Sequence, residues 1–132
     1  MTLRFKPLHN TFAAIATLAD GSPPTLRTLC DAALLEDVRN GMDKYGVLVF
    51  RQQQFSGSEQ IAFAQRLDGE IHAKTGARVL GQNRYGNEAL TDISNVGADN
   101  EIMGKDDRRR LYGLANQLWH TDASFENPRG RY

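Results

Sequence analysis

The chain has 132 residues, enough for one modest domain with a core of its own, and its 16 Lys and Arg balance its 16 Asp and Glu. A chain with no net charge has no long-range field to attract a phosphate backbone or an anionic lipid surface, which argues against nucleic-acid and membrane-surface binding. Cys30 is the only cysteine, so an internal disulfide and a cysteine-ligated zinc cluster are excluded. With no apolar run of membrane-spanning length, we expect a soluble, cytoplasmic protein.

Residues 1–24 are predicted to be irregular or edge structure. The short apolar run at residues 11–16 could form a strand, and Gly-Ser-Pro-Pro at residues 21–24 is a clear break. His9 has no ligand-type neighbour at a useful spacing, so we expect an ordinary surface residue.

From residue 25 to residue 45, apolar side chains recur at steps of three and four, which predicts an amphipathic helix ended by Gly46. Cys30 and Met42 lie on its apolar stripe and are expected to fill the core. The β-branched and aromatic run at residues 47–50 is typical of a strand buried on both faces.

A second helix is predicted after Ser56. Ser56 and Glu59 have the spacing of a capping box, in which each residue satisfies a backbone amide of the other. The helix should place Ile61 and Leu67 on one face and end near Gly69.

The following segment carries weaker signals. His72 and Lys74 lie in a glycine-containing stretch that we expect to be loop with short strands, and His72 is interpreted first as an ordinary loop histidine. Residues 90–96 alternate between apolar and polar, which predicts a half-buried strand. Residues 97–110 are predicted to form an exposed loop.

Residues 118–125 carry the strongest chemical signal. In a strand, side chains alternate between faces, so His120 and Asp122 would share one face while Trp119 and Thr121 share the apolar one. The imidazole and the carboxylate would then be about 6–7 Å apart along the backbone and could lean toward one point. Such a His-x-Asp pair supplies two of the three ligands of the facial triad that binds non-haem Fe(II) with open positions.

The tripeptide alone leaves this interpretation open. His-x-Asp also occurs as a surface ion pair, or as a histidine held in one tautomer by a carboxylate. The apolar partner face and the polar approach Asn116-Gln117 favour the metal site without deciding the matter.

Several stretches in one order resemble the TauD/TfdA-type dioxygenases, and within that family the 2,4-dichlorophenoxyacetate dioxygenase (TfdA-like) branch. The matching stretches are KYGVLVFR at 44–51, QIAFA at 60–64, DISNV at 92–96 and NQLWHTDASF at 116–125. The resemblance covers most of the chain, and its most specific part is the Trp-His-Thr-Asp block.

The resemblance implies a mixed α/β, mainly β fold: part of a double-stranded β-helix (jelly-roll, cupin-like) core with flanking helices. It also implies Fe(II) as the metal and 2-oxoglutarate as co-substrate, with His120 and Asp122 as the catalytic iron ligands. Asn116 matches the position of a polar residue beside 2-oxoglutarate and substrate. His72 or Lys74 lies near the position at which the family contacts the substrate's acid group.

The implied reaction is hydroxylation of a small organic acid by O₂, coupled to decarboxylation of 2-oxoglutarate to succinate. We expect a phenoxyacetate of the 2,4-D type, cleaved to a phenol and glyoxylate, with taurine or another alkylsulfonate as the alternative. A non-catalytic cupin-like binding module is the alternative from another class. The expected partners are the organic acid and O₂, with no nucleic acid and no membrane, and we expect a homo-oligomer.

Family members carry two further groups far downstream of this motif, a distal histidine that is the third ligand and an arginine that binds 2-oxoglutarate. No histidine follows His120, and Arg129 and Arg131 come too soon to be that arginine. We therefore expect residues 1–132 to be the N-terminal part of a single, longer dioxygenase domain.

Overall fold

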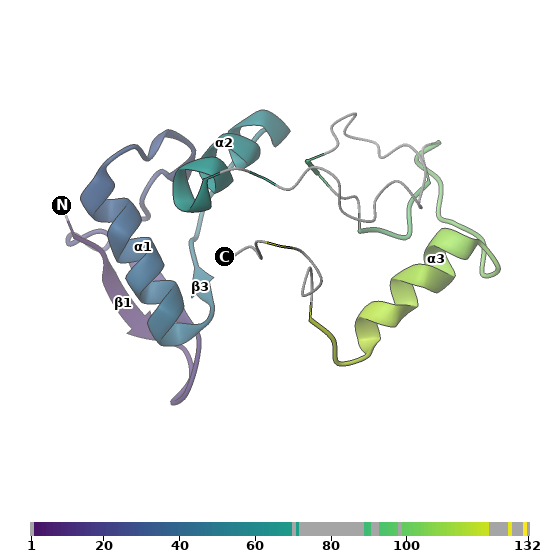
Figure 1. Ribbon diagram of the computed structural model, residues 1–132, viewed down its shortest axis with the longest axis horizontal. Helices are drawn as coiled ribbons and strands as arrows, with labels where there is room; N and C mark the ends of the chain where they lie inside the picture. Colours follow the sequence, from purple (N-terminus) through teal and green to yellow (C-terminus); the bar gives the residue numbers. More distant parts are fainter. Residues whose placement is uncertain are drawn as a thin grey trace. The chain divides into compact units, whose positions relative to one another are not determined.

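The computed structural model describes residues 2–69, 71, 89–90, 93–97, 99–121, 127 and 131. The chain divides into two compact units, unit 1 built on Met1–Glu70 and unit 2 on Ile71–Arg131. Figure 1 draws both units and labels several of their helices and strands.

Unit 1 contains a three-stranded mixed sheet of order β1-β2-β3. The antiparallel pair β1 (Arg4–Pro7) and β2 (Ala14–Thr17) brings Arg4 opposite Thr17. The parallel pair joins β2 to β3 (Leu48–Val49), with Ala14 opposite Leu48. The apolar run at residues 11–16, which the sequence allowed as a strand, contributes its second half to β2. The fold is mixed α/β with a small sheet.

The strand at residues 47–50 differs from its prediction. Only Leu48 and Val49 belong to β3, both are half-buried, and the side chain of Val47 is 47% exposed. Burial on both faces was therefore wrong. In the described part of the chain, β3 is an edge strand with a single partner, because no other described strand pairs with its outer side.

The first long helix begins later than predicted. α1 (Ala32–Tyr45) is capped by Asp31, whose carboxylate accepts hydrogen bonds from the backbone amides of Ala33 and Leu34 at 2.9 and 3.2 Å. The residues before it form only a short 3₁₀ turn, η1 (Leu26–Thr28).

Because the predicted helix is interrupted between η1 and α1, Cys30 does not lie on a helix. The cysteine lies between η1 and α1 and is exposed, so the expectation that it fills the core was wrong. Met42, within α1, packs partly buried against the core as predicted. Gly46 ends α1 with φ +70°, also as predicted.

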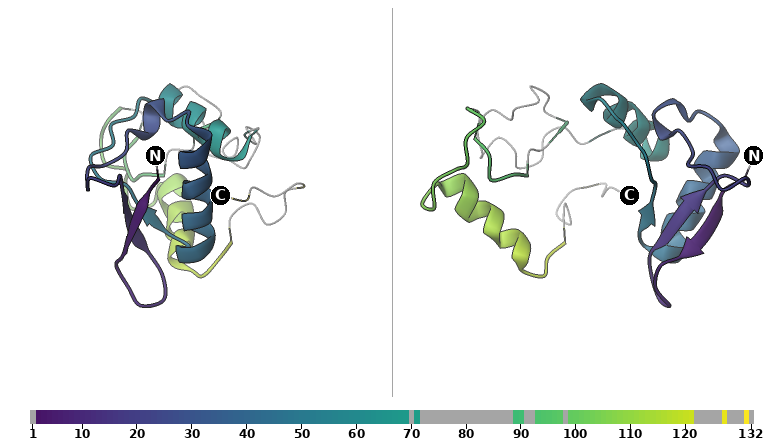
Figure 2. Two further views of the ribbon diagram at one scale, coloured as in Figure 1. Left: turned by 90° about the vertical axis from the view of Figure 1, so that its left-hand side faces the viewer. Right: turned by 180° about the vertical axis from the view of Figure 1, so that it is seen from behind.

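The apolar core of unit 1 lies between the sheet, η1 and α1. Figure 2 shows α1 lying along one face of the strands. The buried members of the cluster are Leu3, Leu26, Leu29, Leu34, Leu35 and Val38. Each fully buried leucine or valine contributes about 1.5–3 kcal/mol relative to an exposed one, so this cluster is the main source of stability in unit 1.

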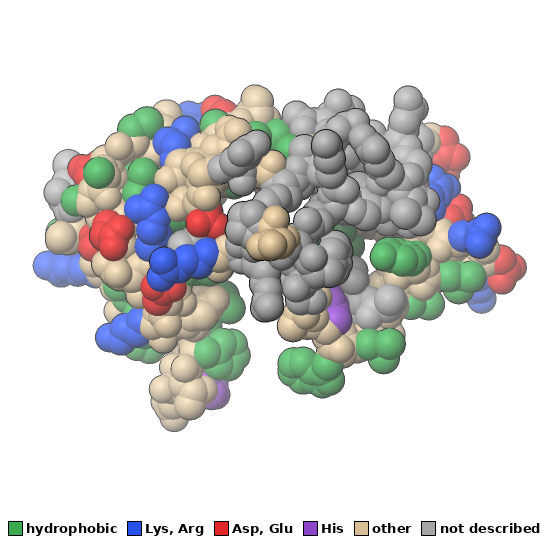
Figure 3. Space-filling view, in the orientation of Figure 1, with side chains coloured by type: hydrophobic (Ala, Val, Ile, Leu, Met, Phe, Trp, Pro, Cys, Tyr) green, Lys and Arg blue, Asp and Glu red, His purple; other side chains and the backbone are tan. Residues whose placement is uncertain are grey.

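The surface of unit 1 is mixed in charge. Figure 3 shows acidic and basic side chains interspersed on its visible face, as the balanced composition predicts. His9 is exposed there as predicted, with its Nδ1 3.0 Å from Thr11 Oγ1 and its ring 5.0 Å from that of Phe12.

The second helix, α2 (Gly57–Asp68), has the predicted capping box. The Ser56 amide donates to Glu59 Oε2 at 2.8 Å, and the Glu59 amide donates to Ser56 Oγ at 3.3 Å. The hydrogen bond from the Ser56 amide lowers the pKa of the Glu59 carboxyl. The helix ends at Gly69 with φ +88°, as predicted.

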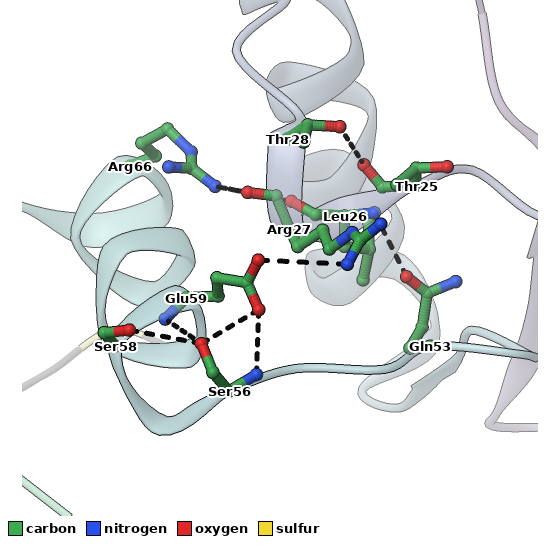
Figure 4. A network of polar contacts seen from close by, with 9 residues as sticks. All are labelled: Thr25, Leu26, Arg27, Thr28, Gln53, Ser56, Ser58, Glu59 and Arg66. Atoms are coloured by element: carbon green, nitrogen blue, oxygen red, sulfur yellow. Dashed lines mark hydrogen bonds and ion pairs between the residues drawn. The ribbon is translucent and has the colours of Figure 1, made fainter.

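Polar contacts join α2 and the loop before it to the rest of unit 1. Figure 4 shows Arg66 of α2 extending toward η1, where its Nη2 donates to the carbonyl oxygen of Arg27 at 2.8 Å.

The loop before α2 is held by Gln53. Its side chain donates to the carbonyl of Pro24 at 2.8 Å and accepts from the amide of Leu26 at 3.1 Å. Arg39 of α1 donates to the carbonyl of Leu67 at 2.8 Å. These bonds join segments that lie 27 or more residues apart in sequence.

The described part of unit 2 contains α3 (Arg108–Gly113) and η3 (Leu114–Gln117). The predicted strand at residues 90–96 is wrong over described residues 93–96, where only Val96 is paired, in an isolated bridge with Ile102. The predicted loop at residues 97–110 is exposed over most of its described residues, but α3 begins inside it. Within the part of the chain that the structure describes, every helix is too short or too polar to cross a lipid bilayer.

Candidate functional site

The candidate site lies directly after η3. His120 is exposed, and its Nδ1 lies 2.7 Å from the carbonyl oxygen of Leu118. A carbonyl oxygen only accepts, so Nδ1 carries a proton and donates it, and in the neutral ring the lone pair is on Nε2. Metal-binding histidines usually donate their second ring N–H to a carbonyl or carboxylate, which fixes the ring's tautomer and orientation. The neutral form of this ring therefore has the tautomer that metal coordination through Nε2 requires.

The backbone around His120 differs from the prediction. Leu118 lies in a bend and residues 119–121 have no regular structure, so the predicted strand is wrong over its described part. Trp119 is 104% exposed and does not pack against a core, contrary to the prediction. A strand requires a hydrogen-bonded neighbour, and none of the described strands pairs with this segment.

The other predicted site residues cannot be placed around His120. Asp122, His72 and Lys74 lie outside the described residues. Asn116 belongs to η3, while its side chain lies outside the described part of the structure. Their roles stay predictions.

Among the candidate site residues, His120 is the one whose side chain the structure describes. Within the described part, no three His, Cys, Asp or Glu side chains come together in a group that could hold a metal ion. The tautomer of His120 fits an iron ligand, and completing the site requires groups from outside the described residues. The acceptor role of the Leu118 carbonyl had no sequence signal, because it depends on how the backbone bends between residues 118 and 120.

α3, the helix that precedes the site, is stabilised at its N-terminus by the charged side chains of Asp107 and Arg109. Asp107 caps α3 through a 2.9 Å hydrogen bond from the Arg109 amide, and Arg109 Nη2 lies 2.8 Å from Asp107 Oδ2. The hydrogen bond from the Arg109 side chain, followed by the one from its amide, lowers the pKa of Asp107 from 3.8 to about 2. The carboxylate therefore stays ionised at neutral pH and stabilises the positive end of the helix dipole.

Known proteins match this chain along most of its length. The model of a family described as "Taurine catabolism dioxygenase TauD, TfdA family" matches residues 4–132. The chain is 37% identical over 135 residues to the alpha-ketoglutarate-dependent 2,4-dichlorophenoxyacetate dioxygenase of Cupriavidus pinatubonensis, covering 100% of this chain and 44% of that protein. It is 41% identical over 103 residues to the protein of the same name from a Burkholderia species, covering 76% of this chain and 33% of that protein.

A solved structure agrees with these matches. The crystal structure of AAD-2 in complex with Mn(II) and N-oxalylglycine superposes with a TM-score of 0.73 at 30% identity, covering 96% of this chain and 38% of that chain. The chain thus spans less than half the length of each of these proteins. The family match covers nearly the whole sequence, and the chain belongs to the TauD/TfdA dioxygenase family.

Proposed function

We propose that this chain is part of an Fe(II)- and 2-oxoglutarate-dependent dioxygenase that hydroxylates a small organic acid. The observation that carries the proposal is the 37% identity, across the entire chain, to a relative named as an alpha-ketoglutarate-dependent dioxygenase. The tautomer of His120 supports it, because in the neutral ring with its proton on Nδ1 the lone pair that can coordinate a metal is on Nε2.

His120 and Asp122 would hold the iron, together with a further ligand from outside the chain described here. When bound, iron with 2-oxoglutarate and O₂ supplies the oxidising power for C–H hydroxylation. The Mn(II) and N-oxalylglycine bound by AAD-2 are a divalent cation and a 2-oxoglutarate analogue, in keeping with this proposal. The Leu118 carbonyl keeps the proton of His120 on Nδ1 and so holds Nε2 as the donor atom.

The other groups belong to the same proposal. Asn116 would contact 2-oxoglutarate or substrate, and His72 or Lys74 the acid group of the substrate. The fold we infer for the complete domain is a double-stranded β-helix, of which this chain contributes the beginning with its flanking helices. The proposal also includes a cytoplasmic location and a homo-oligomer.

The substrate class that the relatives favour is a phenoxyacetate. Both named relatives act on 2,4-dichlorophenoxyacetate by their names. Hydroxylation of the carbon beside the ether oxygen gives a hemiacetal that breaks down to a phenol and glyoxylate, while 2-oxoglutarate and O₂ yield succinate and CO₂. Taurine or another alkylsulfonate is the second candidate, because the family description names taurine catabolism.

The test is a hybrid enzyme in which this chain replaces the aligned part of the C. pinatubonensis dioxygenase. Succinate release is measured with Fe(II), 2-oxoglutarate and O₂, in the presence of phenoxyacetates, of taurine or of no acid. We expect release that depends on a phenoxyacetate, and its loss in both His120→Ala and Asp122→Ala.

The matched control is His9→Ala, which removes an exposed histidine of unit 1 and should leave turnover unchanged. Full turnover in His120→Ala would refute its assignment as a ligand. A folded hybrid that releases no succinate with any of the acids would refute the proposed function.

A further inference from the structure

Unit 1 has a cavity of about 280 Å³ at its surface. It is lined by residues from two segments, 23–27, which lead into η1, and 52–54, in the loop before α2. Its volume is just below the range of pockets that hold drug-sized molecules, so it suits a small ligand. Because all these residues belong to one unit, the cavity does not depend on how the two units are arranged.

The two segments are joined by the side chain of Gln53. Its Nε2 donates to the carbonyl oxygens of Pro24 and Arg51 at 2.8 and 2.7 Å, and its Oε1 accepts from the amide of Leu26 at 3.1 Å. Pro24, which also lines the cavity, is fully buried. A cavity fixed in this way exists before a ligand arrives, so binding costs little conformational entropy.

Arg27 gives the cavity its charge. Among the described residues that line the cavity, it is the only one with a charged side chain. Figure 4 shows its contact with Glu59, in which Nη1 lies 3.9 Å from Oε1, too far for a hydrogen bond. Within the described part of the chain, the guanidinium therefore has an ion-pair partner but donates no hydrogen bond. Its planar set of N–H groups matches the oxygens of a carboxylate or a phosphate.

Two glutamines add further donors. Gln52 and Gln54 line the cavity, are exposed, and make no side-chain hydrogen bond within the described residues. Gln52 also has a φ of +55°. Positive φ costs conformational energy at a residue other than glycine, and residues held in this way cluster at ligand-binding and active sites.

We propose that this cavity binds a small oxoanion, the carboxylate or phosphate group of a small molecule, with Arg27 as the charged anchor. The carboxamides of Gln52 and Gln54 donate further hydrogen bonds to the anion. Glu59 competes with the anion, because both are attracted to the same guanidinium. Anion binding here does not require iron or 2-oxoglutarate.

The test is an NMR titration of the 132-residue chain with inorganic phosphate and, separately, with acetate, at constant ionic strength. The Nε–Hε resonance of Arg27 and the carboxamide resonances of Gln52 and Gln54 report on the cavity. We expect them to follow saturable curves with a Kd of about 1 mM, because one charge-assisted contact in an open pocket supports only weak binding. The ion with the lower Kd identifies which of the two groups the cavity prefers.

Removal of the guanidinium gives the first comparison. Arg27→Gln should weaken binding about tenfold, because a hydrogen bond to a charged group is worth at least that factor. The substitution keeps the carbonyl of Arg27, which accepts the hydrogen bond from Arg66, so the fold should persist. Arg4→Gln removes an exposed arginine of β1 and should leave the Kd unchanged.

Removal of the competing carboxylate should have the opposite sign. Glu59→Gln should tighten binding about threefold, because it frees Arg27 while glutamine still fits the capping box. Glu36→Gln makes the same change of charge at the ion pair with Arg39 and should have no effect on the Kd. A merely structural pairing of Arg27 with Glu59 would not produce this gain in affinity.

The strained backbone gives a third comparison. Gln52→Gly should weaken binding about threefold, because a hydrogen-bond donor is lost, without lowering the melting temperature, because glycine adopts positive φ freely. Asn100, with a φ of +66°, lies outside the cavity, so Asn100→Gly should leave the Kd unchanged.

Three results would overturn the proposal. The first is a set of shifts that stay linear with both ions, which would show only nonspecific screening of charge. The second is the same Kd in Arg27→Gln and Arg4→Gln, and the third is a Glu59→Gln variant that binds no more tightly than Glu36→Gln.

Discussion

Gly41 shows how closely α1 approaches the sheet. A Cβ atom built at this position would lie 2.6 and 2.7 Å from two ring atoms of Phe5, and 2.9 Å from Leu48 Cδ1. Real Cβ atoms do not approach other carbons so closely, so a side chain here would force the helix or the two neighbours to move. The missing side chain at Gly41 therefore allows the contact between α1, β1 and β3.

We expect Gly41→Ala to lower the free energy of unfolding by about 1 kcal/mol. Replacing a helical glycine by alanine normally stabilises by about 0.5–1 kcal/mol, but overpacking costs about 1–3 kcal/mol and should prevail at this contact. Urea denaturation followed by circular dichroism measures the change. Gly113→Ala is the control, because nothing lies within 4 Å of the added atom, and it should not destabilise the protein.

The lowered pKa of Asp107 predicts how the stability of the folded state depends on pH. Its pKa is lowered from 3.8 to about 2 by the side chain and then the amide of Arg109. A carboxyl whose pKa falls on folding stabilises the folded state above its unfolded pKa, and this contribution is lost as the pH falls from about 4 toward 2. The ¹³Cγ resonance of Asp107 should titrate with a midpoint near 2. In Arg109→Gln the midpoint should rise toward 3.8, and an unchanged midpoint would show that Arg109 is not the cause.

At the scale of elements, the start of α2 depends on its capping box. Removing the Ser56 hydroxyl leaves the amide of Glu59 without its acceptor, so Ser56→Ala should destabilise the protein by about 1 kcal/mol, measured by thermal unfolding. Ser58 is the control, since within the described part of the chain its hydroxyl contacts the Ser56 hydroxyl and caps no backbone amide. If Ser58→Ala costs as much as Ser56→Ala, the capping assignment is wrong.

Local signals predicted where helices end better than they predicted sheets. Gly46, Gly69 and the Ser56 capping box act within one helical turn, so the sequence alone reveals them. The start of α1 was missed because the apolar period continues back to Leu26. Asp31, an N-cap residue before two alanines, was the signal that could have corrected it.

Strands and site geometry depend on residues far away in the sequence. The alternation at residues 118–121 predicted a strand, but a strand forms only beside a neighbour, and no described strand lies there. His120 itself was identifiable, because the His-x-Asp motif specifies residue types. The contact of its Nδ1 with the Leu118 carbonyl was not, because no side-chain pattern encodes that bend.

At the scale of the whole molecule, the two units should differ in stability. Amide protection follows buried apolar packing, and every buried hydrophobic residue in the described part of the chain lies in unit 1. Hydrogen–deuterium exchange of the chain alone should show strong protection in α1 and β2 and little in α3. Strong protection of α3 in the isolated chain would contradict this.

The core of unit 1 is built from residues near the start of the sequence, and this has a consequence for biosynthesis. The buried cluster runs from Leu3 to Val38, and the side chains of Phe63 and Leu67 pack against it, so within the described residues every member of this core precedes Gly69. A ribosome adding roughly 5–20 residues per second needs about 3–10 seconds to translate from Gly69 to His120, and small domains fold within microseconds to seconds. The nascent chain therefore has time to form this core before His120, the proposed iron ligand, has been translated.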